Sequence, residues 1–299
     1  MPTAPATLAR TRLIWLGIAI LYVVWGSTYL GIRIAVETIP PFLLAGTRFG
    51  IAGLVLLAIA LLRRRGRIPM PTRREVRDMT IIGAALTVGG MGLVSFGEQT
   101  VPSGITALLI AMMPLWVAVL GRVFFGERLP LVAVAGVALG LAGVGILVGP
   151  SLTASGSESF NPAGIAALIL SPISWACGSL YSSHRARLPK DPLVAFAYLT
   201  LVGSLIAFTA YVWLLKVAPL PLIATYAYVN PIVAVVLGAI ILQEPITPRT
   251  IVAGAVIIFA VALIITARGR MMNAARRATQ LRERQPAVAP AGAETDAAA

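Results

Sequence analysis

Three charged side chains stand within or beside strongly apolar stretches, where ionisable groups are costly and are therefore candidates for function. Arg48 lies about seven residues into such a stretch, some 10 Å along a helix at about 1.5 Å per residue. Its guanidinium could face a polar cavity and pair with Glu37, with Glu98 or with an anionic solute, or it could form a structural ion pair between two helices. Glu98 ends an apolar stretch, and it could bind and release a proton or be a solvated carboxylate at the membrane rim.

Uncharged polar and aromatic side chains gather near prolines inside the apolar stretches. Proline frees a backbone carbonyl within a helix, and discontinuous helices near the membrane midplane build the sites of many carriers. We therefore predict mid-span breaks at Pro114 and Pro231. Aromatic side chains beside them would form an apolar cavity wall, although packing and interface positions explain each one singly. The predicted cavity residues are Trp25, Ser27, Thr28, Tyr29, Met113, Pro114, Trp175, Ser179, Tyr226, Tyr228, Asn230 and Pro231.

Residues suited to catalysis or metal binding are scarce. The chain has one histidine, His184, in a basic turn, and one cysteine, Cys177, which excludes an intrachain disulfide and a cysteine-based metal site. No H-E-x-x-H, G-x-x-x-x-G-K-[ST] or G-x-S-x-G motif is present. We therefore expect no catalytic residue, no metal and no cofactor, and the missing phosphate loop argues against a self-contained ATP-driven pump.

The elements that must position these residues are membrane-spanning helices. Of the 299 residues, 58% are hydrophobic and 12% are charged, and the mean hydropathy is +0.90. Soluble chains carry about 25% charged residues, so the composition excludes a soluble enzyme and a disordered protein. It predicts an all-α polytopic membrane protein. Nine segments can span: Leu13–Ala35, Pro41–Leu62, Met79–Phe96, Ser103–Phe125, Leu131–Gly149, Pro162–Ser183, Leu193–Leu215, Pro219–Leu242 and Ile251–Ala267.

The net charge of +13 indicates topology. Basic residues mark cytoplasmic loops, and residues 63–77 contain seven arginines, which places the amino terminus in the cytoplasm. The loops after the third and fifth segments carry no basic residue, and the turn at 184–190 is basic, so six spans agree. Three further spans would put the carboxyl terminus outside, yet residues 268–284 contain six arginines. The excess charge fits this topology and attraction to anionic lipid rather than nucleic-acid binding.

An internal repeat explains the conflict. Four residues recur 117 positions later: Pro102, Pro114, Gly121 and Glu127 at Pro219, Pro231, Gly238 and Glu244. We expect both glutamates, which follow helix ends, to cap or pair at turns. Trp25 and Trp175 instead differ by 150 positions. The offset falls by 33 after about Pro192, and restoring a helix equivalent to Pro41–Leu62 gives ten spans and a cytoplasmic carboxyl terminus. Five spans per half would make the halves inverted relative to each other, as in many secondary transporters.

Two blocks of sequence carry a family resemblance. The run WGSTYLGIRIAVETIPPFLLAGTRFGIAGLVLL (Trp25–Leu57) resembles the opening of EamA-type transporters of the drug/metabolite transporter superfamily. Met112–Leu147 and Val229–Leu263 resemble its Pro…Gly…Gly-Glu-Arg block, with Gln243 where the family usually has glycine. The resemblance covers about residues 12–267. It implies a ten-helix carrier or exporter of small metabolites in the bacterial inner membrane, built from two inverted five-helix repeats, from which this chain departs by lacking the seventh helix.

We divide the chain into a flexible tail (1–11), a first half of five spans (12–149), a second half of four spans (162–267) and a basic, then disordered, tail (268–299). The expected function is secondary transport, as an exporter, of small organic metabolites or drugs by alternating access. Its partners would be a small-molecule solute and membrane lipids, with no nucleic acid, and nothing specifies an oligomer. One alternative is a non-transporting or folding-impaired deletion product of such a carrier. A less favoured alternative is a membrane-embedded enzyme, which would need clustered His, Asp or Glu on one face.

Overall fold

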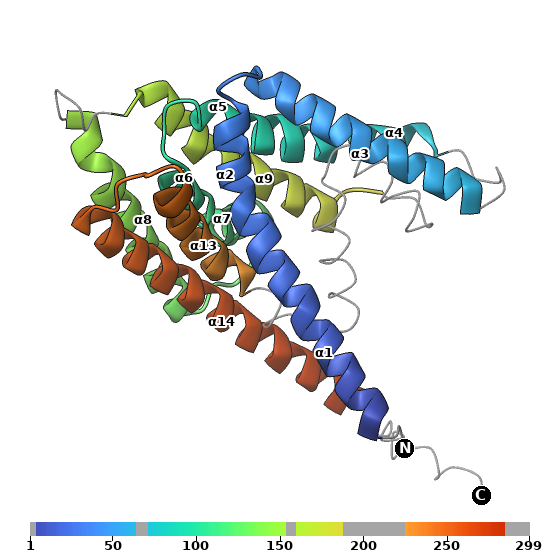
Figure 1. Cartoon of the computed structure of the whole chain (residues 1–299). Coiled ribbons are helices and arrows are strands. Elements are labelled where there is room, and N and C mark those ends of the chain that lie inside the picture. The colour runs from blue at the N-terminus through green and yellow to red at the C-terminus, as the bar shows by residue number, and fades with distance from the viewer. Residues whose placement is uncertain (1–3, 64–70, 154–159, 188–224, 285–299) are drawn as a thin grey trace, which may run out of the picture.

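The computed structural model describes residues 4–63, 71–153, 160–187 and 225–284, and every regular element in these ranges is a helix (Figure 1). The predicted segment Leu193–Leu215 lies outside the described residues, as does the beginning of Pro219–Leu242. Seven helical stretches in the described ranges are long and apolar enough to span a membrane, and they correspond to seven of the nine predicted segments. These are Thr11–Ala35, Pro41–Ile59, Arg73–Gly97, Ser103–Phe125, Leu131–Pro150, Pro162–His184 and Pro248–Met271.

Two of these spans widen into π-helical turns. The first consists of α1 (Ala4–Ile20), η1 (Leu21–Trp25) and α2 (Gly26–Ala35). The third consists of α4 (Arg73–Gly83), η2 (Ala84–Gly92) and α5 (Leu93–Gly97). Such turns leave backbone carbonyls without the usual partner and are frequent at functional sites.

The predicted proline breaks have different outcomes in the two halves. The fourth span divides into α6 (Ser103–Ile110) and α7 (Met113–Phe125), with a turn at Ala111–Met112 that ends two residues before Pro114. The break predicted at Pro231 is wrong, because α13 (Tyr226–Ile241) continues through this residue. Pro231 sits one turn after the start of α13, where a missing N–H removes only one bond of a newly begun ladder.

Four further helices lie in the described ranges. They are α3 (Pro41–Arg63), α8 (Leu131–Thr153), α9 (Pro162–His184) and α14 (Pro248–Arg284). Helices α8 and α14 pack closely and antiparallel, because a Cβ on Gly136 would meet Ile264 whereas one on Gly143 would meet Ile257. Small residues permit such close approach where apolar burial no longer drives association.

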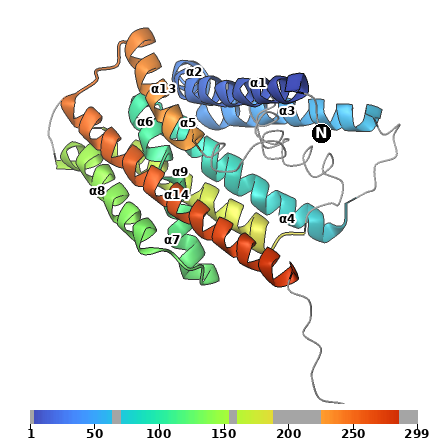
Figure 2. The same ribbon diagram turned by 90° about the horizontal axis from the view of Figure 1, so that it is seen from below.

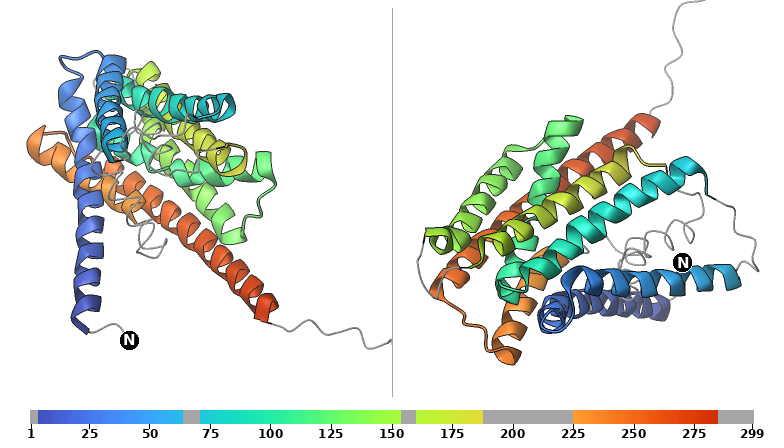
Figure 3. Two further views of the ribbon diagram at one scale, coloured as in Figure 1. Left: turned by 90° about the vertical axis from the view of Figure 1, so that its right-hand side faces the viewer. Right: turned by 90° about the horizontal axis from the view of Figure 1, so that it is seen from above.

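The buried core lies among α6, α7, α8, α9 and α14, and its fully enclosed members include Leu108, Leu115, Leu168 and Ile257. Helix α13 packs against both α2 and α6 beside this core (Figure 2). The beginning of α1 and the end of α14 lie at the same end of the bundle (Figures 1 and 3).

Candidate functional site

A cavity of about 630 Å³ lies between helices of the two halves, as far as the described residues enclose it. The first half contributes residues of η1, α2, α3, α4, η2, α5, α6 and α7, and the second half contributes α9 and α13. The lining is mostly aliphatic and aromatic. Ten of the predicted cavity residues line it: Trp25, Thr28, Tyr29, Met113, Pro114, Trp175, Ser179, Tyr226, Asn230 and Pro231. Arg48, predicted as a charge-pairing residue, lines it as well.

Aromatic rings connect the two halves across this cavity. The rings of Trp25 and Tyr226 meet edge to face, with centroids 4.8 Å apart and an interplanar angle of 71°. Trp175 of α9 lies against η2, where a Cβ on Gly90 would come within 3.0 Å of its ring. Glycine at this position is therefore what lets the indole approach the π-helical backbone.

Two serines of α9 satisfy the π-helical backbone beside the cavity. Ser171 Oγ donates to the carbonyl oxygen of Gly90 at 2.9 Å, and Ser174 Oγ donates to that of Ala85 at 2.9 Å. In a membrane, backbone groups that leave the regular helical ladder need partners from the protein. These bonds stabilise the widened third span against the first helix of the second half.

Three predicted residues lie away from the cavity wall. Ser27 Oγ donates to the carbonyl oxygen of Val24 on its own helix. Tyr228 packs against the main hydrophobic core. Glu37 is exposed beyond the end of α2.

Arg48 lines the cavity from α3 and is half-buried. Its guanidinium carbon lies 5.3 Å from the centre of the neighbouring Phe49 ring. Glu98 is close enough to act electrostatically on both Arg48 and Tyr29. The arginine therefore places a positive charge at one side of an otherwise apolar cavity.

The expectation of a solvated Glu98 is wrong, because this side chain is completely buried. The turn that carries it folds inward: Val101 N donates to the carbonyl oxygen of Gly97, and Arg33 donates to the backbone oxygens of Glu98 and Gln99. In the described part of the chain, neither carboxyl oxygen of Glu98 has a hydrogen-bond partner. Burial raises the pKa of Glu98, which lies just beyond its span, well above the ordinary value. The Glu244 carboxylate acts in the same direction, whereas Arg33 and Arg48 oppose it.

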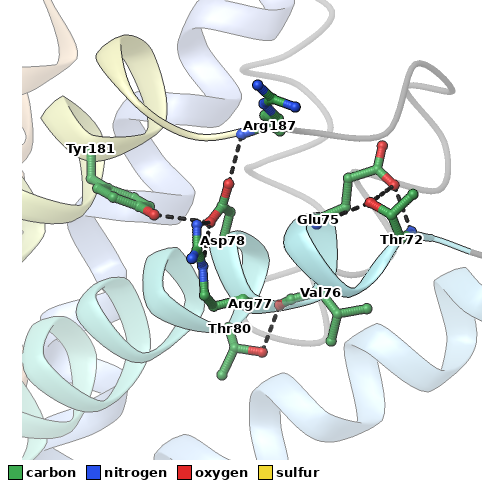
Figure 4. A network of polar contacts seen from close by, with 8 residues as sticks. All are labelled: Thr72, Glu75, Val76, Arg77, Asp78, Thr80, Tyr181 and Arg187. Atoms are coloured by element: carbon green, nitrogen blue, oxygen red, sulfur yellow. Dashed lines mark hydrogen bonds and ion pairs between the residues drawn. The ribbon is translucent and has the colours of Figure 1, made fainter.

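Asp78 is absent from the predicted site residues, because the predicted third span starts one residue after it. Figure 4 shows Asp78 accepting hydrogen bonds from the Tyr181 hydroxyl and the Arg187 backbone N–H, each at 2.9 Å. It also forms an ion pair with Arg77 at 2.9 Å, and its side chain is 2% exposed. This network joins α4 of the first half to the end of α9 in the second. An acidic residue next to an arginine at the start of an apolar stretch was the available signal.

The repeated glutamates Glu127 and Glu244 end their helices with the same backbone geometry. The Glu127 N–H donates to the carbonyl oxygen of Gly121 at 3.2 Å, and the Glu244 N–H donates to that of Gly238 at 3.1 Å. The residues before them are left-handed: Gly126 has φ +65° and Gln243 has φ +57°. A left-handed residue after the last helical turn is a common helix end, and here a hydrogen bond between residues six positions apart closes it.

The side chains of these glutamates have different partners. Glu244 accepts hydrogen bonds from Ser103 N at 2.8 Å, Ser103 Oγ at 2.9 Å and Gly104 N at 3.2 Å. Glu127 instead pairs with Arg268 at 2.6 Å, and His184 Nε2 lies 3.4 Å from its other oxygen. Both glutamates connect the two halves, at opposite ends of the bundle.

Comparisons with known proteins agree with a membrane transporter. The EamA-like transporter family matches residues 13–149 and 155–266. The uncharacterized inner membrane transporter YedA of Escherichia coli K12 is 37% identical, over 82% of this chain and 88% of its own. An uncharacterized transporter of Archaeoglobus fulgidus is 22% identical, over 85% of this chain and 99% of its own. A crystal structure with 22% identity shares the fold with a TM-score of 0.53, covering 85% of this chain and 98% of that one.

The alignments with these two transporters are longer than the matched part of this chain. The YedA alignment has 278 positions, but 82% of this chain is about 245 residues, so about 33 positions have no counterpart here. The Archaeoglobus alignment has 285 positions against about 254 residues, which leaves about 31. Both differences equal about one helix with its connection.

Proposed function

Because the chain belongs to the EamA-like transporter family, we propose that it is a secondary transporter that exports small organic metabolites or drugs by alternating access. The observation that carries this proposal is the cavity of about 630 Å³ lined by helices of both halves. A relative movement of the two halves would change the side from which such a cavity is reached. Its volume lies within the range of small-molecule sites.

The cavity lining suits a solute with an apolar body and one or two polar groups. Trp25, Trp175 and Tyr226 supply aromatic surface, and Arg48 supplies a positive charge. The Oδ1 atom of Asn230 is buried and has no hydrogen-bond partner among the described residues. A buried acceptor gains from a donor on the solute, so Asn230 would select solutes that carry an N–H or O–H group.

Glu98 is the residue we assign to proton coupling. A buried carboxyl group with both oxygens unpartnered is more stable protonated than ionised. Access of water to this group in another conformation would allow it to release the proton. The neighbouring charges of Arg33, Arg48 and Glu244 would then adjust the equilibrium between the two forms.

The orientation we propose has the amino terminus in the cytoplasm of a bacterial inner-membrane protein. Residues 63–77 and 268–284 carry the arginines that favour this side. The shared location of the α1 beginning and the α14 end supports a cytoplasmic carboxyl terminus as well. An Ala299→Cys label in a Cys177→Ser background tests it. Reaction with a membrane-impermeant maleimide from the periplasmic face of intact cells would contradict this orientation.

Flux through proteoliposomes tests the function directly. The panel would contain ethidium, benzoate and an aliphatic amine, with pyranine inside the vesicles to report protons. We expect flux of at least one solute, lost in Asn230→Leu and retained in the matched control Ser27→Ala, whose hydroxyl bonds a carbonyl of its own helix. Proton movement with the solute should be lost in Glu98→Gln. Equal flux in empty and protein-containing vesicles would contradict the proposal.

A second candidate is a shortened carrier that does not transport. The fall in repeat offset from 150 to 117 and the unmatched 33 alignment positions support a missing helix after about Pro192. The same flux assay separates the candidates. Absence of flux in this chain, with flux restored by inserting a helix equivalent to Pro41–Leu62 after Pro192, would favour the shortened carrier.

A further inference from the structure

The hydrogen bonds of Glu244, in the second half, cap the beginning of helix α6, for which the described part of the first half supplies no side-chain cap. Helix α6 begins after Pro102, and no local side chain caps it. The first N–H groups of a helix have no partner within that helix. Glu244 supplies this partner from the other half, since Ser103 N, Ser103 Oγ and Gly104 N all donate to its carboxylate. We call these three hydrogen bonds the Glu244 cap.

The Glu244 cap lies in a tightly fitted contact between the halves. A Cβ on Gly238 would come within 2.4 Å of the Glu244 carboxylate and within 2.7 Å of Ser103 Oγ. A Cβ on Gly104 would lie 3.0 Å from Val235 of α13. Ser103 is completely buried. A negative charge at a helix N-terminus is also favoured by the helix dipole, so separating these helices breaks charged hydrogen bonds between a partly buried carboxylate and a buried helix end.

The repeat cannot build the same cap at its other end. The residues 117 positions after Ser103 and Gly104 are Leu220 and Pro221. Leucine has no hydroxyl and proline has no N–H, so two of the three donors are missing from the equivalent positions. Glu127, the counterpart of Glu244, pairs instead with Arg268 through side chains that are 25% and 22% exposed.

We propose that Glu244 is a positioning residue that holds shut the end of the bundle where it caps α6, and that opening this end during transport requires the Glu244 cap to break. The proposal rests on the proposed alternating-access function. The Glu127 pair at the opposite end does not have this role, because Glu127 binds the side chains of Arg268 and His184 and caps no helix that the structure describes in the other half. The two ends of the carrier are therefore closed by unequal contacts.

Access to the cavity from the Glu244 face of the membrane tests the proposal. Thr28, which lines the cavity and is half-buried, is replaced by cysteine in a Cys177→Ser background. A membrane-impermeant maleimide is then applied to each face in oriented vesicles. We expect Glu244→Gln to raise the labelling rate from the Glu244 face about tenfold, because charged hydrogen bonds are lost. Ser103→Ala, which removes one donor, should give a smaller increase.

The matched control is Glu75→Gln. Glu75 also caps a helix, but its hydrogen bonds close its own α4 with Thr72. It should leave labelling unchanged, and Glu127→Gln should not raise labelling from the Glu244 face. The proposal is overturned if folded Glu244→Gln and Ser103→Ala label at the parent rate, or if Glu75→Gln accelerates labelling equally. Changed labelling without solute flux would support the cap and contradict the transport function.

Discussion

The Glu127 and Glu244 ends of this protein share a backbone design but differ in what their side chains contact. Each glutamate follows a left-handed residue and donates its N–H to a glycine carbonyl six residues back. Glu244 then binds the backbone of a buried helix N-terminus, whereas Glu127 binds two side chains near solvent. The backbone of the turn is therefore the same in both repeats, whereas the partner across the interface determines how strongly the two halves are held together.

Both glutamates are partly buried, so the difference has its physical basis in their partners, which are a buried helix N-terminus for Glu244 and half-exposed side chains for Glu127. Charged hydrogen bonds in a water-poor contact are worth about 1.5–3 kcal/mol each, whereas ion pairs near solvent are worth about 0–1 kcal/mol. The Glu244 end should therefore be the more strongly closed of the two. Four measurements on the folded protein in detergent test this ranking.

Gly238→Ala and Gly121→Ala should show the largest contrast. An added Cβ at Gly238 would displace the Glu244 carboxylate from its buried partners, at a cost of about 2–4 kcal/mol of unfolding free energy. At Gly121 the added Cβ meets the Glu127 carboxylate, which can move toward solvent, so we expect a loss below about 1 kcal/mol.

Thermal unfolding measures both substitutions. Gly46→Ala is the control, because a Cβ there meets no atom within 4 Å, and alanine favours a helix by about 0.5–1 kcal/mol. It should not lower stability. Equal losses at Gly121 and Gly238 would contradict the ranking of the two ends.

Above the ordinary carboxyl pKa of about 4, the pH dependence of stability should come from the Glu244 end, through Glu98. Burial raises the pKa of Glu98 in the folded protein, so the folded state keeps a proton that the unfolded state releases. The contribution of this proton to stability is fully present below the ordinary glutamate pKa of about 4.3. It is lost as the pH rises toward the folded pKa of Glu98, by at most about 1.4 kcal/mol per pH unit. Glu98→Gln should remove this slope. An identical slope in parent and variant would show that Glu98 is ionised when folded.

The sequence could predict most of the spans and most of the cavity wall, but not the buried polar contacts around the site. Hydrophobic length located seven spans that the structure describes, and the proline-aromatic clusters located most of the cavity wall. Hydropathy alone could not predict that Glu98 turns inward, because its burial depends on Arg33 binding the backbone of a distant turn. Nor could it predict that Glu244 caps α6, since this contact joins residues about 140 positions apart.

Gln243 and Gly126 allow the shared turn itself to be compared. Gln243 is the one non-glycine residue with positive φ in the described ranges, and Gly126 is its repeat equivalent. A side chain in the left-handed region costs about 1–2 kcal/mol. Gln243→Gly should therefore stabilise the protein by about 1 kcal/mol, and Gly126→Ala should destabilise it by a similar amount, both read from unfolding midpoints. A loss on Gln243→Gly would mean that the glutamine side chain has a compensating contact.

Arg268→Gln should have the smallest effect and provides the strictest test of the comparison. The Glu127–Arg268 pair is partly exposed, so its removal should cost about 0.5 kcal/mol and less at high salt, because salt screens exposed charges. A double-mutant cycle with Glu127→Gln isolates the pair and excludes the contribution of His184. The same cycle between Glu244→Gln and Ser103→Ala should give a larger coupling that salt leaves unchanged. If the two couplings are equal in size and in salt dependence, the two ends are held equally, and the partner across the interface does not decide the energy of the repeated turn.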